Sequence, residues 1–480
     1  MSRMSKVGAA AVAVGALSAL AACSDRLDVP NFQNPTAASV VGDPAGNLPF
    51  LATGVLRDDR GNAPGYILGV GILGREVYNY TPTEGRNTSG FLTSDVNNNT
   101  SFGATSGSLW NSQFFTIRDA FNTLSVVESA PSTVFSDAQK NSMRGLLATE
   151  TALADLYLIN ARDSLGIPVD VYTDPAKLAP FVSRDSAFNF IQGTLDKAYT
   201  QLQAGGSAFP FTLHSGFTGF STPSTYAKFN RALAARVAVY RASLGTKGCG
   251  TARSAACYQI ALTDLQNSFI DGSATGSMTT GVYNVYSAAA NDVANSVSNA
   301  ASSSVVAHAK SDSGIMTRPD GSLDLRFTTK FVKLAQPKSG PATIAGVPTN
   351  WDHTIYPDRT SPISIIRNEE LILLRAEAEY YTGDQASALN DINAIRTRSG
   401  GLAARGAFTS ETDFVDELLY NRRLSLTFEG HRWVDMRRFN RLNQLTIDVP
   451  SHIVVSRLVI PQTECLVRSI APPELKAPGC

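Results

Sequence analysis

The sequence has little histidine or cysteine for metal binding or nucleophilic chemistry. Five cysteines and five histidines occur in 480 residues, and the histidines are scattered at His214, His308, His353, His431 and His452. Neither an H-E-x-x-H metal motif nor a G-x-S-x-G nucleophile elbow is present. We therefore expect no enzyme, no metal and no cofactor. A catalytic pair of carboxylates that is brought together only by the fold would leave no motif in the sequence.

Excess charge is also missing. The chain has 41 basic and 41 acidic side chains, so its formal net charge is zero. Nucleic-acid-binding proteins carry a basic surface that attracts phosphates. We therefore expect no nucleic-acid partner. Length alone would allow two to four domains, but the composition does not favour splitting residues 51–480, which we predict to form a single body.

The first 23 residues have the pattern of an export signal. Arg3 and Lys6 precede an apolar run over 7–22 that is shorter than the roughly 20 residues needed to span a membrane. The run ends in Leu-Ala-Ala-Cys23, which resembles the lipobox of bacterial lipoproteins. We predict a lipoprotein signal peptide over 1–22, with Cys23 lipidated by acyl chains such as palmitate. The alternative is an ordinary secretory peptide that happens to contain a cysteine.

The next residue, Ser24, fits transfer to the outer membrane. No later segment is long and apolar enough to span a bilayer. In an oxidising compartment the four remaining cysteines would pair locally, Cys249 with Cys257 and Cys465 with Cys480. A metal site is the rival reading, but no histidine lies near either pair.

Three stretches lack a helical pattern. Residues 23–50 contain several prolines and asparagines, which predict a lipidated N-terminus followed by an extended tether. Residues 54–109 are rich in Gly, Asn, Ser and Thr, which predicts long loops. Residues 270–360 are rich in Ser, Ala and Gly, which predicts irregular structure with a short strand pair. Loops this long inside a compact body are more often functional than accidental.

Five aromatic side chains lie in these predicted loops, where a large ring has little core to join. Sugars are held by apolar ring faces stacked on Trp or Tyr, which makes these residues candidate ligand contacts. The alternative is that they pack onto the body. They are Trp351, Tyr356, Tyr78, Tyr80 and Tyr66.

Apolar residues at three- and four-residue spacing predict amphipathic helices elsewhere. A helix over 384–398 is expected to start at Asp384 as its N-cap, and Ser410 with Asp413 forms a capping-box pattern. Helix pairs joined by short turns predict tetratricopeptide-like hairpins. The helical segments begin near Trp110, then cover about 137–161, 184–203, 225–244, 363–382 and 384–398, with another starting near Ser410.

Four charged residues fall on the apolar stripes of these helices: Glu150, Arg236, Arg422 and Glu429. A buried charge without a partner is very costly. We predict structural ion pairs between neighbouring helices, with a polar ligand site as the alternative. The segment from Gly69 to Gly74 fits the G-x-G-x-x-G dinucleotide motif, but no strand is predicted before it, so a cofactor role is not expected.

The strongest resemblance lies near the C-terminus. The block Glu417-Leu-Leu-Tyr-Asn421-Arg-Arg-Leu-Ser425-Leu-Thr-Phe-Glu429-Gly-His-Arg-Trp-Val-Asp435-Met-Arg-Arg-Phe resembles the E-R-R-x-E-L-x-F-E-G-x-R-W-x-D-L-x-R block of the SusD/RagB family. Asn421 and Ser425 stand where the family has glutamates. Four further blocks match in family order, around Trp110 to Asn122, Glu150 to Pro168, Ala234 to Val237 and Arg375 to Arg398.

This resemblance implies a mainly α, SusD-like body of tetratricopeptide-like hairpins that cradle a TonB-dependent, SusC-like barrel transporter in the outer membrane. Such a lipoprotein faces outside and acts as a lid that helps to capture an oligosaccharide or a peptide and release it inward. The rival hypotheses are a surface-anchored hydrolase, suggested by His353 and loop carboxylates, and an adhesive lipoprotein without a small ligand.

Overall fold

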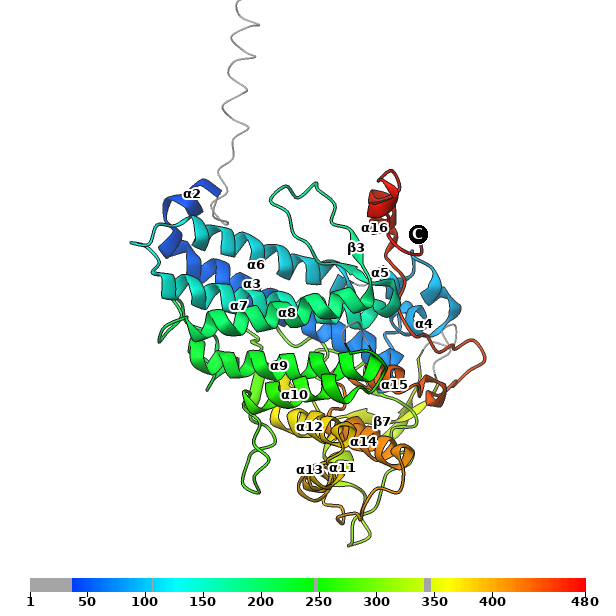
Figure 1. The fold of residues 1–480 in the computed structure, drawn as a ribbon. Coiled ribbons are helices and arrows are strands. Elements are labelled where there is room, and N and C mark those ends of the chain that lie inside the picture. The colour runs from blue at the N-terminus through cyan, green and yellow to red at the C-terminus, as the bar shows by residue number, and fades with distance from the viewer. Residues whose placement is uncertain (1–36, 106, 246–248, 341–346) are drawn as a thin grey trace, which may run out of the picture. The chain divides into compact units, whose positions relative to one another are not determined.

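The computed structural model describes residues 37–105, 107–245, 249–340 and 347–480 (Figure 1). The chain divides into two compact units, residues 1–47 and 48–480. The predicted signal peptide, Cys23 and the tether up to residue 36 lie outside the described residues. The first unit is described from helix α2 (Ala37–Gly42) onward.

Helices α2 and α3 (Pro44–Leu73) overturn two predictions. Residues 37–42 and 44–50 are helical rather than extended, and residues 54–73 are helical rather than loop. Pro44 lies in the first turn, where its missing N–H costs no hydrogen bond. The glycines of α3 permit close packing: a Cβ on Gly69 would lie 2.7 Å from Leu109 Cδ1. The G-x-G-x-x-G segment is therefore the end of a packed helix, and burial of residues such as Leu48 and Val55 outweighs the poor helix propensity.

The second unit is mainly α-helical, as predicted. Figure 1 shows α6 to α10 side by side in chain order, followed by α12, so that consecutive helices pack as antiparallel hairpins. This is the tetratricopeptide-like packing expected from the sequence. The longer helices are α6 (Asn111–Ser129), α7 (Asp137–Arg162), α8 (Arg184–Gln203), α9 (Pro223–Leu244), α10 (Ala255–Gln266), α12 (Asn368–Thr382), α13 (Gln385–Arg398) and α14 (Glu411–Ser425).

Side-chain caps explain where several of these helices begin. Ser136 and Gln139 form a reciprocal capping box before α7. Asp384 accepts a hydrogen bond from the Ser387 N–H, which confirms it as the N-cap of α13. Ser410 likewise accepts from the Asp413 N–H, but the Asp413 carboxylate accepts from Thr409 and Arg405 instead of completing a capping box.

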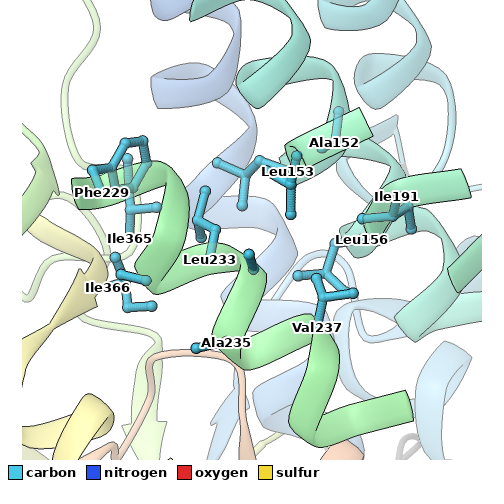
Figure 2. Close-up of a cluster of buried hydrophobic side chains, with 14 of the residues drawn as sticks. Ala152, Leu153, Leu156, Ile191, Phe229, Leu233, Ala235, Val237, Ile365 and Ile366 are labelled. Atoms are coloured by element: carbon cyan, nitrogen blue, oxygen red, sulfur yellow. The ribbon is translucent and has the colours of Figure 1, made fainter. Parts of the chain in front are cut away.

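The main core lies where α7, α8 and α9 meet strand β8 (Ile363–Arg367). Figure 2 shows side chains of α9 between those of α7 and α8 on one side and those of β8 on the other. Leu153, Ile191, Leu233 and Ile366 are fully buried there. The helix predicted from residue 363 begins only at Asn368, because residues 363–367 pair as a strand with β4 (Gly281–Asn284).

The strands of the described residues form small antiparallel pairs, β1 with β5, β2 with β3, β4 with β8, and β6 with β7. Residues 270–360 are largely irregular with short strands, close to the prediction. The strands are β1 (Val77–Asn79), β2 (Ile167–Pro168), β3 (Phe181–Val182), β4 (Gly281–Asn284), β5 (Val305–Ala307), β6 (Phe331–Lys338) and β7 (Thr349–His353). The short helices are α4 (Arg86–Leu92), α5 (Phe102–Thr105), α11 (Leu325–Lys330), α15 (Arg432–Arg438) and α16 (Gln462–Val467).

Two disulfides close short loops. Cys249 bonds to Cys257 with their Cα atoms 5.4 Å apart, and Cys465 bonds to Cys480 with theirs 5.5 Å apart. These are the pairings expected from the sequence. Among the described residues, no helix is both long and apolar enough to cross a bilayer.

Candidate functional site

A groove with a volume of about 580 Å³ is lined by residues of helices α6, α7 and α8. Leu124 and Phe190 give it an apolar surface, and Asn189, Lys197 and Gln201 add groups that form hydrogen bonds. Binding sites for small molecules are typically hollows of roughly 300–1,000 Å³, mostly apolar with a few polar groups. The groove has the size and composition of such a site.

An ion pair lies in the groove wall. The Arg144 guanidinium donates through Nε and Nη2 to the two carboxylate oxygens of Glu128. This hydrogen bonding lowers the pKa of Glu128 and raises that of Arg144. Both groups are therefore charged at neutral pH and cancel one another, which leaves exposed Lys197 as the unbalanced charge of the lining.

A second hollow of about 270 Å³ shares Leu124 and Phe190 with the groove, so the two are continuous. It extends past Phe121 to the segment 169–171, where Asp170 adds a carboxylate. The combined surface can hold a ligand with apolar faces and scattered polar groups, such as a sugar chain or a peptide. The sequence did not reveal this site, because Leu124 and Phe190 follow the same helical spacing as core residues.

The predicted ion pairs form for three of the four stripe charges. Arg236 of α9 donates to both oxygens of Glu370 in α12 at 2.7 Å. Arg422 of α14 donates to Asp435 of α15 at 2.8 Å. Glu429 pairs instead with strand β8, accepting from Arg367 Nη2 at 2.9 Å.

Glu150 is the exception, because no salt bridge joins it to a basic side chain within the described ranges. The Tyr226 hydroxyl donates to its Oε1 at 2.6 Å. Burial, and secondly the nearby Asp59 carboxylate, raise the pKa of Glu150 to about 8. A neutral carboxyl satisfied by a hydroxyl avoids the cost of an unpaired buried charge, so the ion-pair prediction is wrong here.

The two departures from the family block sit around one arginine. Arg326 is paired with Asp324, and its Nη1 donates to Asn421 Oδ1 at 2.9 Å and to Ser425 Oγ at 3.1 Å. Neutral side chains therefore accept hydrogen bonds where the family has glutamates, and Asp324 supplies the negative charge from another segment.

Four of the five candidate ligand aromatics belong to the core. Tyr66, Tyr78, Tyr80 and Tyr356 are each at most 6 % exposed. Three hydroxyls find acceptors within the protein: Asp448 for Tyr78, the Val347 carbonyl for Tyr80 and the Phe428 carbonyl, at 2.9 Å, for Tyr356. A tyrosine whose hydroxyl is satisfied inside the protein can bury its ring. Tyr66 packs against another ring instead, with its centroid 4.2 Å from that of Tyr157.

Trp351 alone remains partly accessible. It lies on β7, and its ring meets that of Phe327 edge-on with centroids 5.0 Å apart. Trp110 and Trp433 are fully buried. His353, the residue behind the hydrolase hypothesis, is buried beside Phe428 and Tyr356. Within the described residues no cluster of His, Cys, Asp or Glu is arranged to hold a metal ion.

Comparisons with known proteins agree with the fold. Residues 335–456 match the sequence model of the SusD family. No curated protein matches the chain. Similar solved structures include a SusD superfamily protein from Parabacteroides distasonis, with 16% identity, a TM-score of 0.64, and coverage of 90% of this chain and 98% of that one.

Two further structures are similar over nearly their whole length. A SusD superfamily protein from Bacteroides vulgatus has 16% identity and a TM-score of 0.63, covering 91% of this chain and 99% of that one. NanU from Bacteroides fragilis has 15% identity and a TM-score of 0.60, covering 93% and 99%. The TM-scores establish a shared fold. The chain therefore has the fold of the SusD superfamily structures, and its residues 335–456 match the SusD family model.

Proposed function

We propose that this protein is a lipoprotein of the outer membrane, anchored through Cys23 and facing outside. In this role it captures a glycan or a peptide and passes it to a TonB-dependent barrel transporter. The match of residues 335–456 to the SusD family model, within a chain that has the SusD-like fold, is the observation that carries the proposal. Such a lid needs a binding equilibrium and a hinge but no catalytic chemistry, so we do not propose an enzyme.

The α6–α8 groove is the best candidate for cargo contact. A lid holds its cargo between itself and the barrel, so the hairpins that would cradle the transporter would also meet the cargo. Phe190 contributes to both hollows of the groove and offers an aromatic face. Asn189 and Gln201 can form hydrogen bonds to hydroxyl or amide groups.

A binding screen with paired variants tests this proposal. The mature chain is incubated with a glycan array and a peptide library, and the affinity of any hit is measured for wild type, Phe190→Ala and Phe115→Ala. Phe115 lies on α6, is 64 % exposed and is not part of the groove lining, so it is the matched control. Losing one buried aromatic contact should weaken binding by roughly tenfold or more.

The expected result is a hit whose affinity falls in Phe190→Ala and stays unchanged in Phe115→Ala. Equal affinities for all three proteins would remove the groove from the proposal. Conversion of a bound glycan to shorter products, measured on the same samples, would contradict a pure binding role and favour a hydrolase.

A further inference from the structure

A separate pocket of about 210 Å³ is lined by positive side chains and by no acidic one. Arg75 follows α3, Lys310 follows β5, Arg423 belongs to α14 and Arg432 begins α15. We call these four residues with the space between them the arginine pocket. Lys310 and Gln444 at its edge are exposed, so the pocket opens to solvent.

The charges of the arginine pocket have no counter-ion. In the part of the chain that the structure describes, no salt bridge joins any of the four basic groups to a carboxylate. Several other buried arginines are paired with carboxylates, as Arg438 is with Glu377 and Asp435. An uncompensated group of cations in a partly dehydrated site is costly, which makes the pocket unusual within this fold.

Backbone carbonyls hold two of the guanidinium groups in place. Arg75 donates to the carbonyls of Thr446 at 3.0 Å and Ile453 at 2.9 Å. Arg423 donates to those of Ser311 and Ser313, both at 2.8 Å. Neutral acceptors orient these groups without cancelling their charge, so the positive potential of the pocket is fixed in position.

Arg432 supplies the free donors. Its Nε donates to the Gly74 carbonyl at 2.9 Å, which anchors the group. Its Nη1 and Nη2 make no hydrogen bond to another described residue, so up to four N–H donors are available to a ligand. Burial, and secondly the neighbouring Arg423, lower the pKa of Arg432 to about 10. The guanidinium stays charged at neutral pH and repels Arg423.

The nearest acidic groups offset part of the pocket's charge from a distance, because Asp448 attracts Arg75, and Glu76 and Asp435 attract Arg432, without forming an ion pair with either. Asp448 accepts hydrogen bonds from Tyr78 and from His308 Nε2, the latter at 2.8 Å. Glu76 lines a smaller adjoining hollow and accepts the Phe428 N–H at 3.1 Å. Burial raises the pKa of Glu76 to about 7, so its carboxyl carries only part of a charge near neutral pH.

We propose that the arginine pocket binds an oxyanion, namely a carboxylate, sulfate or phosphate group, which accepts hydrogen bonds from Arg432 Nη1 and Nη2. Guanidinium groups favour such planar or tetrahedral oxyanions because they donate paired hydrogen bonds. The volume is below the roughly 300–1,000 Å³ of sites for whole drug-sized ligands, so the pocket takes one small group. The inference goes beyond cargo transfer and holds whether or not a transporter is present.

Calorimetric titration of the mature chain at low ionic strength tests the proposal. The probes are inorganic sulfate, inorganic phosphate and glucuronate, with glucose as the neutral control. Binding of an oxyanion but not of glucose is expected. Glucuronate tighter than sulfate and phosphate would identify an acidic sugar as the source, and the reverse order would identify a free inorganic ion. No binding of any oxyanion would overturn the proposal.

Three variants locate the site. Arg432→Gln should weaken oxyanion binding by about tenfold or more, because it removes charge-assisted hydrogen bonds. Lys310→Gln, at an exposed position that folding should tolerate, should weaken it by a few-fold through lost attraction. Arg359→Gln removes an exposed arginine outside the pocket lining and should leave it unchanged. The assignment would be refuted if Lys310→Gln and Arg359→Gln both bound oxyanions as tightly as wild type, and Arg432→Gln either did the same or failed to fold.

Discussion

The ion pair between Arg236 and Glu370 joins α9 to α12 in the core, and its loss should be among the most damaging single changes in the protein. Both side chains are at most 4 % exposed. Arg236→Met would leave the Glu370 carboxylate buried without its partner and would free the Ile365 carbonyl that Arg236 also bonds. Breaking a buried pair from one side costs about 3–5 kcal/mol in free energy of unfolding.

The pKa of Glu370 gives a second measure of the same interaction. Burial opposes ionisation, but Arg236 outweighs it and lowers the pKa from 4.5 to about 2. At about 1.36 kcal/mol for each pKa unit, the difference of 4.5 − 2 corresponds to about 3 kcal/mol. Because the folded-state pKa is lowered, this stabilisation is present above pH 4.5 and is lost as the pH falls towards 2.

Urea unfolding at pH 7 and at several values between pH 4.5 and 2 checks the reasoning. Arg236→Met should lose about 3–5 kcal/mol at pH 7. Its stability should decline less than that of the wild type in the acid range, and a part of the decline should remain because Glu369 also has a lowered pKa. The double variant Arg236→Met, Glu370→Leu should recover most of the loss, since an apolar pair can replace a buried ion pair. A loss below about 1 kcal/mol in Arg236→Met, the size of a surface salt bridge, would refute the argument.

Three further predictions concern other parts of the fold. Burial raises the folded-state pKa of Glu150 to about 8, so its contribution to folding stability should fall as the pH rises from 4.5 through 8. Glu150→Gln should flatten this decline in thermal melts. A pH profile identical to that of the wild type would contradict the prediction. Replacing Cys257 with serine opens a disulfide with a sequence separation of 8 and should cost about 2.5 kcal/mol in chemical unfolding. Reductant should lower the stability of the wild type more than that of the variant, because the variant has only the Cys465–Cys480 bond left to open. Trp351→Ala should weaken cargo binding while lowering the melting temperature only modestly, because the ring is half-buried; a large fall in melting temperature with unchanged binding would assign Trp351 to the core alone.

Helical periodicity and capping residues predict several of the longer helices well. The segment 184–203 coincides with α8, and Asp384 and Ser410 cap their helices as expected. These features depend on local sequence, so they can be read without the fold. Helix α3 could not, because its glycines and prolines resemble loop composition and become favourable only when other segments pack closely against them.

The binding surfaces were harder to predict, because they combine residues that are distant in the sequence. The arginine pocket joins residues 75, 310, 423 and 432, with no spacing that signals their approach. Tyr78 and Tyr356 were misjudged for the same reason, since nothing local shows that Asp448 and the Phe428 carbonyl will accept their hydroxyl groups. The charges on helical stripes were more informative, because burial demands a partner and three of the four found one.

The central claim is that the protein acts as the lid of a barrel transporter, and co-purification from native membranes tests it most directly. The tagged full-length chain is extracted in mild detergent and its partners are identified by mass spectrometry, with Cys23→Ala as the unanchored control. The account predicts a TonB-dependent barrel protein in near-equal amount with wild type and its loss or strong reduction with Cys23→Ala. Recovery of the intact lipoprotein without any barrel protein, under conditions that preserve membrane complexes, would contradict it.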